Sequence, residues 1–124
     1  MTEQTNHSPA RDPQDLERLL IDRQHAGDVA GMVALFERQA VVDCGEGKFL
    51  HGHAEIRRYF TEVVASGRKF ARGVQQPALI CGELALTSTR LPDGSVTAEV
   101  ARRQSDGTWL WAIDPYTIAT EQRS

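Results

Sequence analysis

The sequence predicts an α+β protein in which a strongly curved, mostly antiparallel sheet is wrapped around three N-terminal helices. In the first half of the chain, apolar residues recur at helical spacing and are interrupted by one short hairpin. After Val74 the sequence contains only strand-like runs, separated by turns that carry Gly or Pro. Helix, helix, hairpin, helix and then four strands is the order expected when a sheet folds over a helical layer.

Residues that cap helices or form turns mark the boundaries of the expected elements. Asp12 before Pro13 is typical of an N-cap followed by a first helical residue, and Gly27-Asp28 ends one helix and caps the next. A turn over residues 45–47 joins two short strands, and a break at Gly52 precedes the third helix. The expected elements are helices over Pro13–Ala26, Val29–Phe36 and His53–Ser66, and strands over Ala40–Cys44, Lys48–His51, Val74–Cys81, Glu83–Leu91, Val96–Gln104 and Thr108–Ala119.

The late strands alternate between a polar face and an apolar face. Pairing across the turns at Asp93-Gly94 and Asp106-Gly107 places Glu99 opposite Thr87 and beside Asp114. Strict alternation then puts Trp109, Trp111 and Ile113 on the opposite face together with Leu84, Leu86, Val96, Ala98 and Val100. By pattern alone this apolar face is the core, and the face with Glu99 is solvated.

Composition excludes several classes of protein. The 124 residues form one domain over residues 13–120, preceded by a polar tail over residues 1–12 that we expect to be disordered. A net charge of −3 without a basic cluster predicts no nucleic-acid partner, and no apolar run is long enough to predict membrane insertion. The absence of a signal-peptide pattern and the two unpaired-looking cysteines, Cys44 and Cys81, predict a cytoplasmic protein with reduced thiols.

Two stretches carry a family resemblance. The run ALFERQAVVDCGEGKFLHGHAEIRRYF (Ala34–Phe60) resembles the SnoaL-like and ketosteroid-isomerase-like branch of the NTF2-like families, and the resemblance extends from Asp15 to Ala119. The hairpin TAEVARRQSDGTWLWAIDPY (Thr97–Tyr116) is similar to the DUF4440 (YybH-type) members of that branch. The resemblance implies a cone-shaped NTF2-like fold with an interior pocket, an inward orientation of Glu99, Asp114 and Tyr116, and a homodimer through the outer face of the sheet.

The resemblance also implies a candidate site. Glu99 and Asp114 are the candidate catalytic residues, because two neighbouring carboxyls raise one another's pKa when they are buried and can then serve as acid and base. The walls of the pocket, which would hold a small apolar molecule, are expected from seven residues: Leu20, Phe36, Cys44, Phe49, Tyr59, Phe60 and Tyr116. No cofactor is expected.

The same comparison argues against steroid isomerisation. The family's tyrosine hydroxyls fall on Leu20, Phe36 and Phe60, and its general-base aspartate falls on Cys44, so only Glu99 has a counterpart. Three functions remain open: a cofactor-independent acid–base enzyme of the isomerase, cyclase or hydratase type, a ligand-binding module without catalysis, and a dimerisation domain. The solvated-face interpretation of Glu99 and Asp114 also remains open.

His51 and His53 form an H-x-H pair, a spacing that occurs in metal sites. Asp43 or Glu46 would have to supply a third ligand. The alternative is that the pair ends a strand and opens a helix, and on this interpretation we expect no metal.

Overall fold

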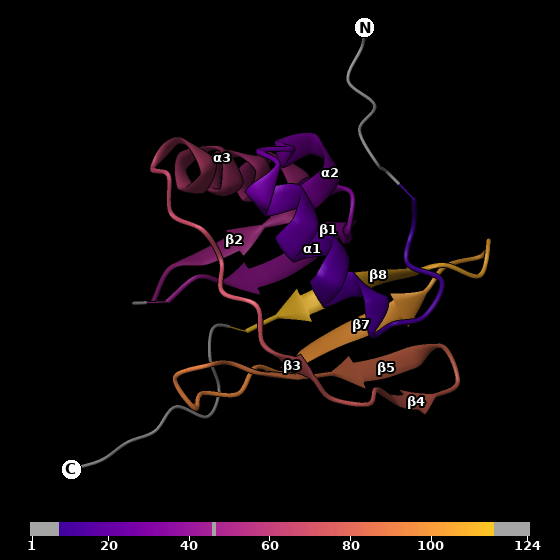
Figure 1. The fold of residues 1–124 in the computed structure, drawn as a ribbon. Helices are drawn as coiled ribbons and strands as arrows, with labels where there is room; N and C mark the ends of the chain where they lie inside the picture. Colours follow the sequence, from indigo (N-terminus) through magenta and orange to yellow (C-terminus); the bar gives the residue numbers. More distant parts are fainter. Residues whose placement is uncertain (1–7, 46, 116–124) are drawn as a thin grey trace, which may run out of the picture.

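The computed structural model describes residues 8–45 and 47–115, which form three helices and eight strands (Figure 1). The elements in chain order are α1 (Asp15–His25), α2 (Val29–Val33), β1 (Phe36–Asp43), β2 (Phe49–His51), α3 (Gly52–Ala65), β3 (Val74–Gln75), β4 (Leu79–Cys81), β5 (Leu84–Thr87), β6 (Thr89–Arg90), β7 (Glu99–Arg103) and β8 (Trp109–Asp114). No helix follows Val74 in the described part of the chain. The predicted fold class is confirmed.

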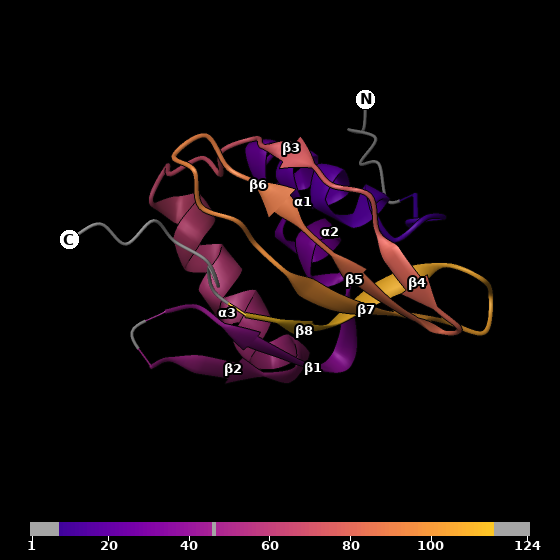
Figure 2. The ribbon, with the colours of Figure 1, turned by 90° about the horizontal axis from the view of Figure 1, so that it is seen from below.

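Six strands form one sheet in the order β2-β1-β8-β7-β5-β4, and β3 pairs with β6 as a separate ribbon. Every neighbouring pair is antiparallel except β1 and β8, which are parallel. The β3–β6 ribbon passes beneath α1, as the view from below shows (Figure 2). The sheet is therefore mostly antiparallel, as the sequence predicts, with one parallel contact where β8 returns beside β1.

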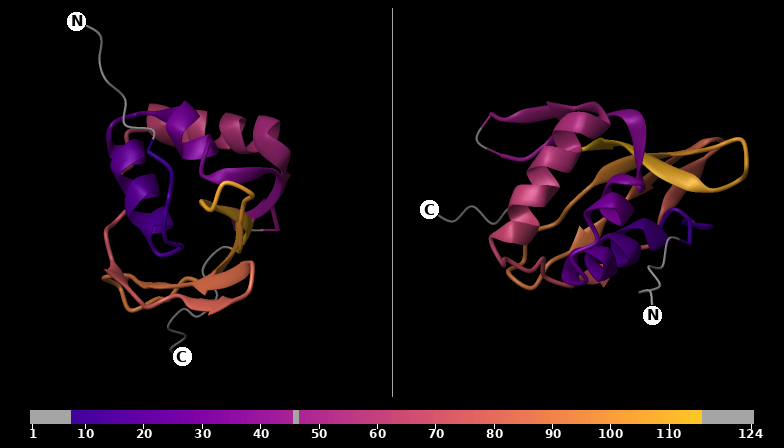
Figure 3. Two further views of the ribbon diagram at one scale, coloured as in Figure 1. Left: turned by 90° about the vertical axis from the view of Figure 1, so that its right-hand side faces the viewer. Right: turned by 90° about the horizontal axis from the view of Figure 1, so that it is seen from above.

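The sheet curls around the helices, which cover its concave face (left panel of Figure 3). The core between the two layers contains residues from every helix and from the central strands. Its largest members are Leu16, Leu19, Leu20, Met32, Leu35, Phe36, Ile56, Phe60, Trp109 and Trp111. Of the helices in residues 8–45 and 47–115, none has both the length and the apolar character that crossing a bilayer requires.

Several boundaries differ from the predicted ones because tertiary contacts compete with local signals. The first helix begins at Asp15, since Asp12 and Pro13 form a turn in which the Asp15 N–H donates to the Asp12 carbonyl at 3.0 Å. The second helix ends at Val33, because Phe36 pairs with Trp111 and so becomes the first residue of β1. The strand expected over Val74–Cys81 is interrupted around Pro77, which cannot donate to a ladder.

A β-bulge in β8 changes the predicted assignment of faces. Val100 pairs with Ile113 and Ala101 pairs with Trp111, so Ala112 is an extra residue in β8. The extra residue breaks the strict alternation, and Trp111 is buried beside Ala101 whereas Ile113 is 49% exposed. The expectation that Trp109, Trp111 and Ile113 share one face is wrong. Both tryptophans belong to the core, and the polar face of β5 and β7 lies inward with them.

Residues before the predicted boundary at Pro13 contact the rest of the fold. Ala10 is buried and its carbonyl accepts the Trp109 N–H at 2.9 Å, while the Ser8 carbonyl accepts from buried Arg23 at 2.6 Å. Because β1 begins opposite Trp111, the Trp109 N–H has no partner on that strand, and Ala10 supplies one. The expectation of a tail is therefore incorrect for residues 8–12. Residues 1–7 lie outside the described residues.

Candidate functional site

A cavity of about 180 Å³ lies between the helices and the sheet, next to the ends of β1 and β8. Its walls come from α1, α3, the segment after α3, and strands β1, β7 and β8. The lining residues are Glu17, Leu20, Val42, Asp43, Cys44, Tyr59, Phe60, Arg68, Phe70, Thr97, Glu99, Asp114 and Pro115.

Three carboxyl groups from separate elements converge on this cavity. Glu17 lies one helical turn before buried Leu20 on α1, so both side chains lie on the inward face. Glu99 is the first residue of β7 and is only 4% exposed, two residues before inward-facing Ala101. Asp114 ends β8 after the bulge and pairs with Val42 of β1. The fold therefore gathers side chains that are far apart in sequence.

Burial changes the acidity of all three carboxyls. Desolvation, together with the negative charge of Glu99, raises the pKa of Glu17 to about 7. Burial also raises the pKa of Glu99, although hydrogen bonds from Thr87 and Thr97 oppose this rise. The pKa of Asp114 lies well above its ordinary value because of burial, with additional effects from the charges of Glu99, Glu17 and Asp43. All three shifts favour the neutral form of the carboxyl, because burial and neighbouring negative charges both oppose ionisation.

A buried hydrogen-bond chain leads from the core to Glu99. The indole Nε1–H of Trp111 donates to Thr87 Oγ1 at 3.1 Å, and the Thr87 hydroxyl donates to Glu99 Oε1 at 2.6 Å. Thr87 and Glu99 are directly paired residues of β5 and β7, as the sequence predicts. This chain fixes the position of the Glu99 carboxyl at the cavity wall.

Aromatic side chains form the apolar wall of the cavity. The ring centroid of Phe60 lies 5.7 Å from that of Tyr59 and 6.5 Å from that of Phe70. The guanidinium of Arg68 lies 5.4 Å from the centroid of Phe70 and is the only Lys or Arg side chain among the described lining residues. The cavity lining thus combines aromatic side chains with a cluster of carboxyls.

Gln24 holds the segment that carries Arg68 and Phe70. Its Nε2–H donates to the Arg68 carbonyl at 2.7 Å, and its Oε1 accepts the Phe70 N–H at 2.9 Å. His25 adds a third contact, because its Nε2–H donates to the Phe70 carbonyl at 2.9 Å. Helix α1 therefore positions one wall of the cavity as well as supplying Glu17.

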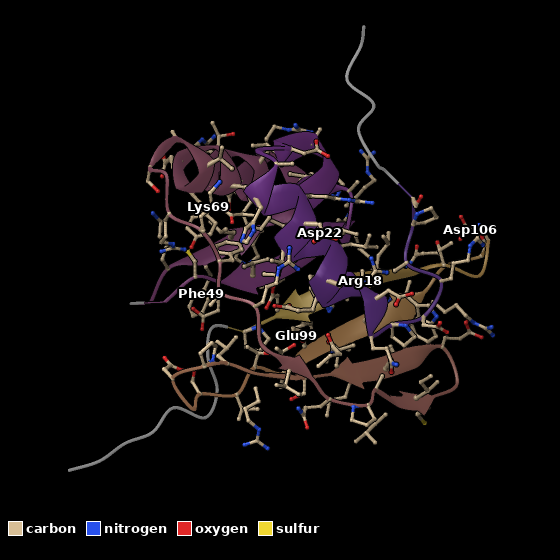
Figure 4. All side chains as sticks on the ribbon, viewed as in Figure 1. Arg18, Asp22, Phe49, Lys69, Glu99 and Asp106 are labelled. Carbon is tan, nitrogen blue, oxygen red and sulfur yellow. The ribbon has the colours of Figure 1, made fainter. Side chains whose placement is uncertain are left out.

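The predicted site residues divide into three groups. Glu99, Asp114, Leu20, Cys44, Tyr59 and Phe60 all line the cavity. Phe36 does not, because it is packed between the rings of Phe60 and Trp111 at centroid distances of 5.8 and 5.3 Å. Phe49 does not either, since it is 56% exposed on β2 and lines a separate pocket of about 220 Å³, apart from Glu99 of β7 (Figure 4). Tyr116 lies outside the described residues.

Sequence reasoning missed Glu17, Arg68 and Phe70. The spacing of Glu17, Leu20 and Gln24 at positions i, i+3 and i+7 is the signal that places Glu17 on the inward face of a helix. Arg68 and Phe70 lie in an irregular segment after α3, where no periodicity indicates an orientation.

The H-x-H pair lies at a strand–helix junction. His51 ends β2, and its N–H donates to the Glu55 carboxylate at 2.8 Å. His53 lies in the first turn of α3, and its Nε2–H donates to the Phe36 carbonyl at 2.7 Å. Within residues 8–45 and 47–115, no three His, Cys, Asp or Glu side chains are grouped so that they could hold a metal ion.

Comparison with known proteins identifies the fold. No protein-family model and no curated protein sequence matches the chain. A candidate association domain of the calcium/calmodulin-dependent protein kinase II type from Thiobacillus denitrificans is similar in structure, with a TM-score of 0.74, 12% identity and coverage of 92% of this chain and 99% of that chain. A candidate dehydratase of the NTF2-like family from Streptomyces avermitilis has a TM-score of 0.66 and 14% identity, with coverage of 85% and 93%.

A ketosteroid isomerase-like protein from Erwinia carotovora is similar to the same degree, with a TM-score of 0.66, 13% identity and coverage of 86% of this chain and 94% of that chain. At these identities the similarity shows the fold alone. The chain has the NTF2-like, ketosteroid-isomerase-like fold that the sequence predicts. The fold occurs in proteins described as enzymes and in one described as an association domain, so function must be argued from the site.

Proposed function

We propose that this protein is a cofactor-independent acid–base enzyme that acts on a small apolar molecule, in a reaction of the isomerase, cyclase or hydratase type. The observation that carries the proposal is the convergence of Glu17, Glu99 and Asp114 on one apolar-walled cavity. Perturbed carboxyls in a cavity are typical of catalytic sites, because catalysis near pH 7 needs both a base and a proton donor.

The proposed chemistry divides the carboxyls by charge. An ionised carboxylate removes a proton from a carbon beside a substrate carbonyl. The electron pair of the broken C–H bond forms a C=C bond, and the π electron pair of the carbonyl moves onto its oxygen. A neutral carboxylic acid donates a hydrogen bond to that oxyanion and returns a proton at a second position. Leu20 and Phe60 lack the hydroxyls that tyrosine donors would provide at these positions, and we assign this hydrogen bond to the neutral acid; Tyr59 and Arg68 are further donors in the cavity lining.

The size of the cavity restricts the substrate. An engineered cavity of about 150 Å³ holds one benzene ring, whereas sites for drug-sized ligands occupy about 300–1,000 Å³. A cavity of about 180 Å³ therefore fits a compound with one ring or a short chain.

The test is hydrogen–deuterium exchange at carbon, which detects proton abstraction even when no net reaction follows. Incubating the protein in D₂O with 2-cyclohexenone or cyclohexanone should give deuterium at the saturated carbon next to the carbonyl, measured by NMR. Glu99→Gln should reduce the exchange rate by at least about 100-fold, the usual contribution of a general base. An equal rate in Glu99→Gln would contradict a role for this cavity.

A ligand-binding module without catalysis is the second candidate, since the same cavity would hold an apolar ligand without turnover. A binding module would show ligand-dependent stabilisation that follows RT ln(1 + [L]/Kd) but no exchange of substrate protons. Thermal unfolding in the presence of the same two ketones measures this stabilisation. A rise in melting temperature without deuterium exchange would indicate a binding module and not an enzyme.

A separate surface favours self-association. One row of apolar side chains crosses the outer face of the sheet, because the strand register pairs each member with the next. The row is Leu79, Leu86, Val100, Ile113 and Val41. Leu79, Leu86 and Ile113 are exposed, and an exposed apolar row of this kind is typical of an interface. We propose that two copies of the chain pack these rows together as a homodimer.

Leu86→Arg is expected to convert the dimer to a monomer, because the new charge lies in the middle of the row and would be buried without a partner. Sedimentation velocity at tens of micromolar measures the change. Thr61→Arg adds the same charge at an exposed position of α3 and should leave the dimer intact. A wild-type chain that sediments as a monomer would contradict the dimer.

A further inference from the structure

The hydrogen bonds around Glu99 fix the direction in which each proton points. An indole N–H can only donate, so Thr87 Oγ1 must accept from Trp111 Nε1 at 3.1 Å. The single hydroxyl proton of Thr87 is then directed elsewhere. Among the described residues, the acceptor within hydrogen-bonding distance is Glu99 Oε1 at 2.6 Å. Glu99 therefore accepts this hydrogen bond, and Oε1 carries no proton.

Thr97 repeats the arrangement from the neighbouring segment. The backbone N–H of Thr89, another group that can only donate, donates to Thr97 Oγ1 at 3.0 Å. The Thr97 side chain lines the same cavity as Glu99 and lowers the pKa of that carboxyl. The Thr87 hydroxyl, which already accepts from a fixed donor, thus directs its proton toward Glu99, and Thr97 favours the same anion. Such an arrangement stabilises a carboxylate.

The other two carboxyls lack this support. Within the described residues, no hydrogen-bond donor reaches the carboxyl group of Glu17 or of Asp114, although both lie in the same cavity. The charged groups that surround Glu99 are Glu17 from α1, Asp43 from β1, Asp114 from β8 and Arg68 from the segment after α3. With one cation against four carboxyls, the proton must reside on a group without donors.

We propose that Thr87 and Thr97 are positioning residues that keep Glu99 ionised, so that the exchangeable proton of the cluster resides on Glu17 or Asp114. In the acid–base chemistry proposed above, on which this inference rests, Glu99 is then the base and one of the other two carboxyls is the donor to the oxyanion. The two threonines act on the reaction through Glu99 and need not contact the substrate.

The test is a carboxyl titration by NMR with the side-chain carboxyl carbons of Glu and Asp labelled. In the wild-type protein Glu99 should ionise at a lower pH than Glu17 and Asp114. Thr87→Val should raise the midpoint of Glu99 by about one pH unit, a tenfold change in proton affinity. The midpoint of Glu17 should fall at the same time, because the Glu99 charge that raises it is partly removed.

Thr89→Val is the matched control. Thr89 is the first residue of β6 and is as buried as Thr87, but within the described part of the chain its hydroxyl oxygen has no hydrogen-bond partner. Its backbone N–H, which orients Thr97, remains in the valine variant. We expect the Glu99 midpoint to be unchanged in Thr89→Val, and Thr87→Ser to restore the wild-type value. If Thr87→Val does not fold, Thr97→Val tests the same prediction.

Two results would overturn the inference: a wild-type Glu99 that ionises last of the three, or equal shifts of its midpoint in Thr87→Val and Thr89→Val. Because the titration needs no substrate, its outcome is independent of the deuterium-exchange experiment. If the wild-type protein catalyses no deuterium exchange but Glu99 titrates as predicted, the proposed reaction is rejected and the role of the threonines still holds.

Discussion

Trp111→Ala is expected to lower the free energy of unfolding by about 3–5 kcal/mol, the range for removing a large buried aromatic side chain. Trp111 has an exposed fraction of 0% and its ring packs on Phe36 at a centroid distance of 5.3 Å. The substitution leaves a cavity at the centre of the sheet and also leaves buried Thr87 without the indole donor. Urea unfolding followed by circular dichroism measures the loss.

Ile113→Ala is the control for this prediction. Ile113 lies two residues further along β8 but on the outer face, so the alanine variant should lose less than about 1 kcal/mol when measured on the monomer. If the bulge at Ala112 were absent, strict alternation would place both side chains on the same face. Similar losses in the two variants would therefore contradict the bulge.

The second large effect is a loss of stability as the pH rises. The pKa of Glu17 is about 7 in the folded protein, against an ordinary value of 4.5. Between these two values the folded chain binds more protons than the unfolded chain, so the free energy of unfolding must fall as the pH rises. The contribution of neutral Glu17 to stability is fully present below pH 4.5 and is lost as the pH rises through 7. Asp114, whose pKa is raised well above its ordinary value, acts in the same direction.

Glu17→Gln should remove much of this pH dependence. A rise in pKa from 4.5 to about 7 corresponds to about 3 kcal/mol, so the glutamine variant should be more stable than the wild type by up to that amount at pH 8. At pH 4 the two should differ little. The measurement is a set of urea unfolding curves from pH 4 to pH 8, with Glu62→Gln, an exposed carboxyl on α3, as the control. A wild-type protein that gains stability over this interval would contradict the burial of Glu17.

The local signals of the sequence determined most of the elements. Periodicity and turn residues predicted three helices followed by strands, and the turn at Pro92-Asp93-Gly94 fixed the pairing of Thr87 with Glu99. A short hairpin turn sets the register of the two strands it joins, so this pairing depends on neighbouring residues alone. The position of Glu99 opposite Thr87 was therefore predictable from the hairpin, whereas the expected inward orientation of Glu99 and Asp114 came from the family resemblance.

Only the tertiary structure decided which side chains meet. The bulge at Ala112 turned Trp111 inward, and it arises where β8 pairs with β7 on one side and with β1 on the other. Ala10 lies in the core because its carbonyl accepts the Trp109 N–H, which has no partner on β1. Glu17 joined the cavity because α1 packs across the concave face of the sheet. These features depend on pairings between residues far apart in the chain, for which a single sequence carries no local signal.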